Sequence, residues 1–353
     1  MKAKHNWRTW AVPVIAVLFG LVGGAILIAL TGKNPFEAYG WLLGGWLRDI
    51  RRFSDTFAIA TQLILTGLSV TFAFRTGLFN IGAAGQMLMG GLAATAIGLL
   101  VPLPSYLLVP LVVLGATLAG ALWGTLPGFL KAQFNVHEVV STIMLNWIAV
   151  WLVAWIVPTW LKSNQETQSA RLPLAASLKM DWLSELTNQS SLNLGLVLAL
   201  VATVIIAIIL KRTTLGFELK AVGFNRLAAE YAGMEDKRNI VVSMAIAGAL
   251  AGLAGATQYA GYAVNLQIQV LPSQGFDGIA VALLGNLTPL GVVASSMFFG
   301  ILYTSRGLMN AALKIPPEIS DTIIAIIIYL SATSILIHRL LDKLTPRKEE
   351  PHD

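Results

Sequence analysis

The chain has 353 residues, of which 56% are hydrophobic and only 12% charged, and its mean hydropathy is +0.72. This composition excludes an ordinary soluble protein and predicts an all-α integral membrane protein. The absence of cysteine excludes disulfides and thiolate metal sites, and the net charge of +6 comes from basic residues that gather at predicted membrane edges, which argues against nucleic-acid binding.

The first predicted span covers residues 10–30. It follows a basic amino terminus, is long enough to cross a bilayer, and lacks the small-residue cleavage site of a signal peptide. Basic residues concentrate on the cytoplasmic side of membrane proteins, so we expect the amino terminus in the cytoplasm. Residues 1–56 are assigned to this span and an external segment. Three arginines between residues 48 and 52 oppose an external position, and an interfacial helix over 36–53 would accommodate them.

Residues 57–161 form the first half of a predicted inverted repeat. A span over 58–74 returns the chain to the cytoplasmic side, and a later span covers 139–161. Between them, no charged residue occurs from Thr76 to Leu130. This run is too long for two simple helices and too short for three, which predicts a broken or re-entrant helix.

The polar stretch 162–185 carries charges of both signs and is predicted to be an external loop. Residues 186–210 form a span that leads to a basic cytoplasmic segment at 211–238. The second repeat half covers 239–341, and a basic cytoplasmic tail follows at 342–353. The sum is about ten membrane segments with both termini in the cytoplasm.

Two glycine-rich stretches, residues 77–91 and 272–286, each follow one hydrophobic span of their repeat half. Backbone polar groups cannot stay unpaired in lipid, so such stretches belong in the protein interior or beside a water-filled path. The first begins on the cytoplasmic side and the second on the external side, and paired interruptions of this kind indicate a transport path. The alternative is close helix packing, which is the prediction for Gly20 and Gly24, Gly120 and Gly124, and Gly248 and Gly252.

Polar side chains at membrane depth are the first candidates for the path: Asn80, Gln86, Asn146, Gln258 and Asp277. The amides suit either a polar solute or a bridge between helices. An intramembrane carboxylate is a candidate functional residue. The alternative for Asp277 is that it caps a short helix beginning at Gly278.

Residues 214–233 form an amphipathic segment bounded by glycine within the basic cytoplasmic region. Leu227, Tyr231 and Met234 recur at helical spacing. A short helix with an apolar face between basic flanks is typical of a segment that docks into another protein's groove.

Four motifs occur in an order found in one known family: Gly77-Leu-Phe-Asn-Ile-Gly82 with Gly85-Gln-Met87, Glu138-Val-Val-Ser-Thr-Ile-Met-Leu-Asn146, Gly216-Phe-Glu-Leu-Lys-Ala-Val-Gly-Phe-Asn225 with Ala228-Ala229 and Gly233, and Gly275-Phe-Asp-Gly-Ile-Ala-Val-Ala-Leu-Leu-Gly285. Over roughly residues 58–330 the chain resembles the permease subunits of ATP-binding-cassette (ABC) importers. Within the branched-chain amino acid and ribose permease superfamily, it is most similar to the nucleoside and simple-sugar uptake group.

The resemblance implies an importer in a bacterial-type cell membrane. In that family two permeases form a pore, two cytoplasmic ATPases drive it, and an external solute-binding protein or lipoprotein delivers the solute. The second permease of nucleoside systems is commonly a different sister chain. The solutes that fit the resemblance are nucleosides, riboflavin and simple sugars, with a nucleoside preferred, and the aromatic faces of Phe74 and Phe79 beside Asn80 would suit a purine.

The resemblance also places the ATPase contact in this chain at Gly216, Glu218, Ala221, Gly223, Asn225, Ala228, Ala229 and Gly233. The sequence contains no G-x-x-x-x-G-K-[ST] phosphate loop. We therefore expect a transport subunit that is not an enzyme and binds no cofactor, with ATP hydrolysed by partner subunits.

Two rival functions are compatible with parts of the sequence. An ion-coupled secondary transporter would also have broken helices, but its usual intramembrane acids or histidines reduce here to Asp277. A membrane-embedded metalloenzyme is suggested by His137-Glu138, but the zinc signature H-E-x-x-H fails because position 141 is Ser141. No metal site is predicted.

Overall fold

The computed structural model describes residues 8–165 and 167–332, and this part of the chain is all-helical, without strands apart from two isolated bridges. Its α-helices are α1 (Arg8–Leu30), α2 (Pro35–Gly44), α3 (Ile50–Arg75), α4 (Ala83–Leu100), α5 (Ser105–Phe134), α6 (Glu138–Trp160), α7 (Asp181–Leu186), α8 (Gly195–Arg212), α9 (Thr214–Phe224), α10 (Arg226–Tyr231), α11 (Asp236–Ala256), α12 (Gln274–Leu284), α13 (Pro289–Leu313) and α14 (Pro317–Ala332). A π-helical turn, Thr257–Tyr262, extends α11.

Seven helices in the described residues are long and apolar enough to cross a membrane. They are α3, α4, α5, α6, α8, α11 with its π-helical turn, and α13. The shorter apolar helices are residues 14–30 of α1 and the whole of α12. The prediction of a membrane protein with several spans is therefore confirmed. The predicted count of about ten membrane segments requires α1, α12 and α14 to cross as well, and it stays a prediction.

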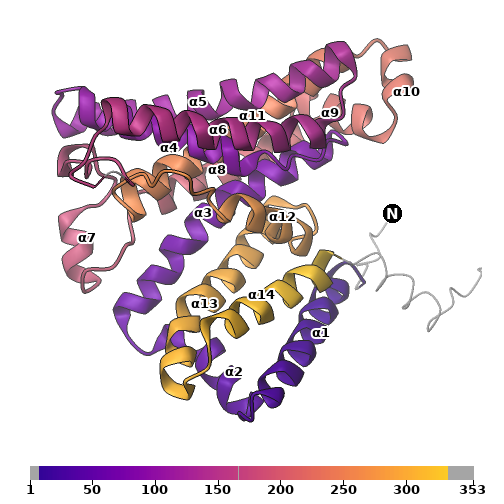
Figure 1. Cartoon of the computed structure of the whole chain (residues 1–353). Helices are drawn as coiled ribbons and strands as arrows, with labels where there is room; N and C mark the ends of the chain where they lie inside the picture. The colour runs from indigo at the N-terminus through magenta and orange to yellow at the C-terminus, as the bar shows by residue number, and fades with distance from the viewer. Residues whose placement is uncertain (1–7, 166, 333–353) are drawn as a thin grey trace, which may run out of the picture. The chain divides into compact units, whose positions relative to one another are not determined.

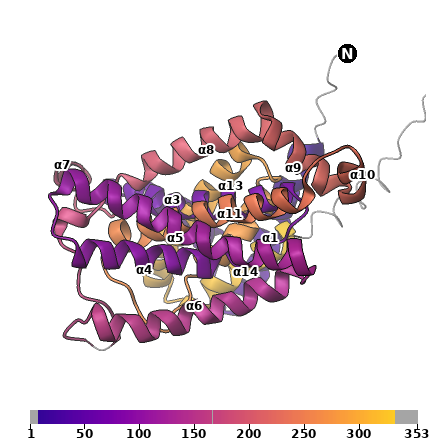
Figure 2. The same ribbon diagram turned by 90° about the horizontal axis from the view of Figure 1, so that it is seen from above.

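The chain divides into two compact units, residues 46–304 and residues 1–45 with 305–353. In the larger unit, α4, α5, α6 and α11 run side by side (Figures 1 and 2). The helices α5 and α11 approach backbone to backbone at their glycines. A Cβ atom on Gly120 would lie only 2.3 Å from the carbonyl oxygen of Gly248. A Cβ on Gly124 would lie 2.4 Å from the carbonyl oxygen of Met244. Close packing at these glycines, as predicted, is confirmed.

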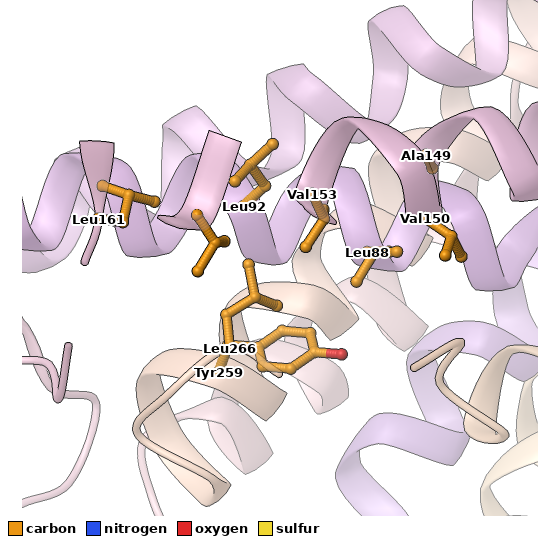
Figure 3. Packing of buried hydrophobic residues seen from close by; sticks show 9 residues of the cluster. Leu88, Leu92, Ala149, Val150, Val153, Leu161, Tyr259 and Leu266 are labelled. Atoms are coloured by element: carbon orange, nitrogen blue, oxygen red, sulfur yellow. The ribbon is translucent and has the colours of Figure 1, made fainter. Parts of the chain in front are cut away.

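An apolar cluster joins α4, α6 and the π-helical turn (Figure 3). Leu88 and Leu92 of α4 face Val150 and Val153 of α6, and the ring of Tyr259 lies beneath them (Figure 3). All of these side chains are buried. One side of α6 is thereby fixed against the rest of the unit.

The smaller unit contains α1, α2, α14 and the end of α13. A Cβ atom on Gly24 of α1 would lie 2.5 Å from the hydroxyl of Tyr39 and 2.8 Å from the side chain of Ile323. Near the start of α14, Asp321 forms an ion pair of 2.5 Å with Arg306 of α13. The predicted packing role of Gly24 is confirmed. Residues beyond 332, which include the predicted cytoplasmic tail at 342–353, lie outside the described residues.

Two sequence-based boundaries are wrong. The single interfacial helix over 36–53 is absent, because α2 ends at Gly44 and α3 begins at Ile50, where the Asp49 carboxylate accepts the Arg52 backbone N–H at 2.7 Å and starts a new helix. The span predicted over 186–210 begins only at Gly195. Asn188 and Gln189 adopt positive φ angles of 55° and 60°, which interrupt a helix.

Candidate docking helices and translocation path

The two short helices α9 and α10 form the predicted docking segment, and a tight turn starts it. The Thr213 hydroxyl accepts the Gly216 backbone N–H at 3.1 Å, so α9 begins immediately after α8. A Cβ atom on Gly216 would lie 2.0 Å from the carbonyl oxygen of Ile209. Glycine is therefore required where α9 folds back against the end of α8.

Gly223 brings α9 into direct contact with the first glycine-rich stretch. A Cβ atom there would lie 2.5 Å from the carbonyl oxygen of Arg75 and 2.9 Å from the backbone nitrogen of Gly77. Gly77 itself has φ of +73°, a conformation that favours glycine. The docking segment and the first break thus touch backbone to backbone, with no side chain between them.

Side-chain bonds hold α9 and α10 to α11. Glu218 accepts a hydrogen bond from the Asn239 amide at 3.0 Å, and Arg226 pairs with Asp236 at 2.5 Å. Between the two helices, the Asn225 side chain accepts the Ala228 backbone N–H at 3.1 Å and starts α10. The segment is therefore a bent pair of helices fixed to the bundle.

The outward surface of this pair consists of large apolar side chains. Phe224 and Tyr231 are 94% and 92% exposed, and Phe217 and Leu227 are also exposed. The predicted docking residues have different places in this pair of helices. Gly216 and Gly223 allow the close backbone contacts, and Glu218 and Asn225 make the hydrogen bonds described above. Ala229 is buried in an apolar cluster against which Ala221 packs, Ala228 is exposed, and Gly233 adopts φ of +82°.

Sequence reasoning passed over Phe217 and Phe224, although two aromatic residues seven positions apart on a short helix share one face. It also grouped Met234 with Leu227 and Tyr231 on one apolar face. That grouping is wrong, because α10 ends at Tyr231 and Met234 packs inward against the buried cluster that contains Ala229.

Buried amides organise the first break. Asn80 and Gln86 are bonded to each other through both amide groups, at 2.9 and 3.2 Å. Asn146 of α6 accepts the Gly85 backbone N–H at 2.8 Å and donates to the Ile81 carbonyl at 3.1 Å. It therefore caps the first turn of α4 from a neighbouring helix. Each of these three predicted path residues has a protein partner.

The two breaks meet. A Cβ atom on Gly275, in the first turn of α12, would lie 2.3 Å from Cα of Ala84, in the first turn of α4. A Cβ on Gly278 would lie 2.8 Å from the backbone carbon of Thr66 in α3. The N-termini of two interrupted helices thus converge beside α3, and both are favourable places for negative charge.

Asp277 lies within the first turn of α12 and is partly buried. Because α12 begins at Gln274, the alternative that Asp277 caps a helix starting at Gly278 is wrong. Phe74 and Phe79 stack edge to face with ring centroids 5.1 Å apart, at the end of α3 and in the first break. Gln258 lies in the π-helical turn, and its side-chain oxygen has no hydrogen-bond partner among the described residues.

Arg75 links the docking segment to both breaks. Its carbonyl lies under Gly223 of α9, and its guanidinium donates to the carbonyl of Leu287, just past α12, at 2.7 Å. The end of α3, the end of α12 and the start of the first break are therefore gathered at one residue beneath α9.

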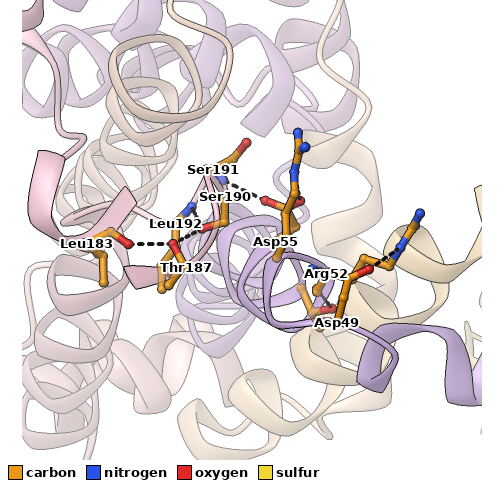
Figure 4. A network of polar contacts seen from close by, with 10 residues as sticks. Asp49, Arg52, Asp55, Leu183, Thr187, Ser190, Ser191 and Leu192 are labelled. Carbon is orange, nitrogen blue, oxygen red and sulfur yellow. Dashed lines mark hydrogen bonds and ion pairs between the residues drawn. The ribbon is translucent and has the colours of Figure 1, made fainter. Parts of the chain in front are cut away.

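At the opposite end of α3, the polar stretch 162–194 is tied to the bundle. Asp55 accepts the backbone N–H of Ser191 at 2.7 Å, and Thr187 and Ser190 bond to each other at 2.7 Å (Figure 4). Burial, with the positive charge of Arg171 and Arg51, lowers the pKa of Lys179 there. This end of the unit therefore carries a fixed cluster of charges.

The same stretch pairs with the chain that leads into the second break. Ser169 donates its backbone N–H to Leu266 at 2.8 Å, and Leu172 donates to Val264 at 2.9 Å. The polar stretch therefore holds the chain that leads into the second break at one end of the unit. At the opposite end of the unit, α9 holds the first break.

Comparison with known proteins decides the family. Residues 53–332 match the family described as branched-chain amino acid transport system, permease component. The chain belongs to this family of permeases. Its members are transport components of ABC systems and are not themselves catalytic, and the several membrane-spanning helices place this permease in the cell membrane.

Three relatives of this permease are similar along most of its length. It is 42% identical to the guanosine ABC transporter permease protein NupP of Bacillus subtilis (strain 168), over 94% of this chain and 96% of that protein. It is 41% identical to the nucleoside ABC transporter permease protein NupB of Lactococcus lactis subsp. cremoris (strain MG1363), over 96% and 95%. It is 26% identical to NupQ, also a guanosine ABC transporter permease protein of Bacillus subtilis, over 69% and 78%.

Proposed function

We propose that this permease forms part of the translocation path of an ABC importer for nucleosides. The observation that carries the proposal is the arrangement at α9, whose outer face is apolar and exposed and whose inner face touches the first break at Gly77. Its similarity to permeases named for guanosine and nucleoside transport supports the choice of solute.

An ATPase in the cytoplasm would receive the exposed side chains of α9 and α10 in a groove. Movement of the ATPases on binding ATP would then be transmitted through Gly223 to the backbone at Arg75 and Gly77. Because Arg75 also binds the carbonyl of Leu287, the same movement would reach α12. This permease would bind no cofactor of its own.

The path would run beside the converging starts of α4 and α12, in an inverted repeat formed by residues 57–161 and 239–341. Both termini and α9 with α10 would lie in the cytoplasm, with α1, α12 and α14 completing about ten segments. Gln258 is the path residue best placed to meet a solute, since its side-chain oxygen has no hydrogen-bond partner among the described residues, whereas Asn80, Gln86 and Asn146 already bind protein groups. The external solute-binding protein would dock at the charged end that carries Asp55 and Lys179.

The proposal is tested by reconstituting this permease with its ATPase, a sister permease and the solute-binding protein in liposomes. We expect uptake of labelled guanosine that requires ATP and is reduced by unlabelled nucleosides but not by riboflavin or glucose. Uptake that persists without ATP and follows a proton or sodium gradient would instead establish an ion-coupled transporter. Absence of guanosine uptake, together with ATP-dependent uptake of labelled glucose, would establish a sugar importer.

A further inference from the structure

The exposed face of α6 carries a row of tryptophan side chains. Trp147, Trp151 and Trp155 follow one another at four-residue spacing and therefore share one face. Their exposed fractions are 56%, 63% and 62%. With Trp160 at its end, α6 holds four of the ten tryptophans of the chain.

The position of this row along the helix is unusual for lipid-facing tryptophan. In membrane proteins tryptophan is enriched at the two membrane–water interfaces. Helix α6 has 23 residues, and Trp147 and Trp151 follow its first residue by roughly 13 and 20 Å at a rise of 1.5 Å per residue. In a hydrocarbon layer about 30 Å thick, both lie near the middle rather than at an edge.

The neighbouring spans present a different surface. The exposed side chains in the middle of α5 are leucines, among them Leu114, Leu118 and Leu122. Those of α8 are valine, leucine and isoleucine, among them Val204 and Ile208. Aliphatic faces of this kind suit lipid, whereas tryptophan and methionine are enriched at the centres of protein interfaces.

The row cannot be turned inward by rotation of α6. The opposite side of the helix is held by the apolar cluster of Figure 3 and by the two hydrogen bonds of Asn146 to the start of α4. The tryptophans therefore stay on the outer surface of the larger unit, one helix away from the first break.

The comparisons indicate what covers this surface. Two different permease proteins of Bacillus subtilis (strain 168), NupP and NupQ, are each named as a guanosine ABC transporter permease protein, and both are similar to this chain. We infer that Trp147, Trp151 and Trp155 of α6, with Met144, which precedes Trp147 by three positions and is 58% exposed, form the contact surface for a second, related permease subunit. The inference rests on the proposed function, because it takes the chain to be one permease of an ABC importer.

The chain contains no cysteine, so single cysteines can be introduced without removing any. Trp151→Cys is compared with Leu118→Cys, a matched exposed position of α5. Each variant is expressed alone and together with the sister permease, the ATPase and the solute-binding protein, and is labelled with a bilayer-soluble pyrene maleimide. We expect Leu118→Cys to react equally in both states and Trp151→Cys to react at least about fivefold more slowly in the assembled importer.

A photo-crosslinking residue, p-benzoylphenylalanine, at position 147 provides a second measurement that does not depend on Trp151→Cys folding. We expect a product that contains peptides of the sister permease, whereas the same residue at position 118 should give lipid adducts. Lipid adducts at both positions or a crosslink within this chain would overturn the inference. So would a Trp151→Cys variant that reacts equally fast alone and in the assembled importer. ATP-driven guanosine uptake, measured on the same preparations, reports separately on the proposed function.

Discussion

Gly223 shows how a single missing side chain determines a contact. Any residue larger than glycine at this position places a Cβ atom against two backbone groups, the carbonyl of Arg75 and the nitrogen of Gly77. Backbone atoms cannot move aside as a flexible side chain would. The helix α9 would therefore have to separate from the first break.

We expect Gly223→Ala to insert into the membrane normally but to lower ATP-driven guanosine uptake by about tenfold or more, because α9 loses its backbone contact with the first break. Uptake in vesicles, normalised to the amount of permease, measures this. Gly40→Ala is the matched control, since nothing lies within 4 Å of its added Cβ atom. Unchanged uptake by Gly223→Ala would show that this contact does not transmit the movement of the ATPases to the first break.

At this scale the sequence indicated amides at membrane depth but not their partners. Asn80, Gln86 and Asn146 stood out as amides at membrane depth, and all three are buried. Their bonds, however, cross between elements: Asn146 caps a helix turn at Gly85, 61 residues away in the chain. Such a partner depends on how α4 and α6 pack, which a local pattern does not determine.

Among the elements, the predicted docking helices α9 and α10 have two different faces. The glycines and Asn225 set the path of the backbone, whereas Phe217, Phe224, Leu227 and Tyr231 form the surface available to a partner. Exposed aromatic side chains commonly contribute most of the free energy of an interface.

We expect Phe224→Ser combined with Tyr231→Ser to reduce the affinity for the ATPase by about tenfold or more. Co-purification of the ATPase with the permease in detergent, at several ATPase concentrations, measures the change. Trp182→Ser is the control, because Trp182 is an exposed aromatic residue of α7, outside the docking segment. Equal co-purification of both variants would show that the ATPase binds elsewhere.

Element boundaries followed the apolar runs where charge marked both ends. The span predicted over 139–161 corresponds closely to α6, from Glu138 to Trp160. The prediction failed before α8, where polar residues with positive φ lie next to an apolar run. In the uncharged run after Arg75, the expected break is a non-helical stretch of residues 76–82, followed by two helices.

Across the whole molecule, Arg75 connects elements that are distant in sequence. The residue joins α3, α9 and the end of α12, and its bond to Leu287 spans 212 positions. No sequence pattern marks this role, since Arg75 reads simply as the charge that ends a span.

We expect Arg75→Gln to retain the ATPase and its hydrolysis of ATP in the reconstituted importer but to lower uptake by roughly tenfold. The shorter neutral side chain loses a hydrogen bond from a charged group, worth about 1.5 to 3 kcal/mol. Hydrolysis and uptake are measured on the same liposomes. Lys211→Gln, an exposed basic residue near the end of α8, is the control. If ATP hydrolysis and uptake fall together in Arg75→Gln, Arg75 does not act only by passing the movement of α9 on to α12.

The glycine contacts between α5 and α11 limit how the protein can change shape. With main chain resting on main chain at Gly120 and Gly248, no rotamers between the two helices can switch to let one slide past the other. We therefore expect α5 and α11 to move together as one rigid body in each transport cycle. We expect the bending to fall on non-helical segments that adjoin the pair, such as residues 135–137 after α5 and 263–273 after the π-helical turn of α11.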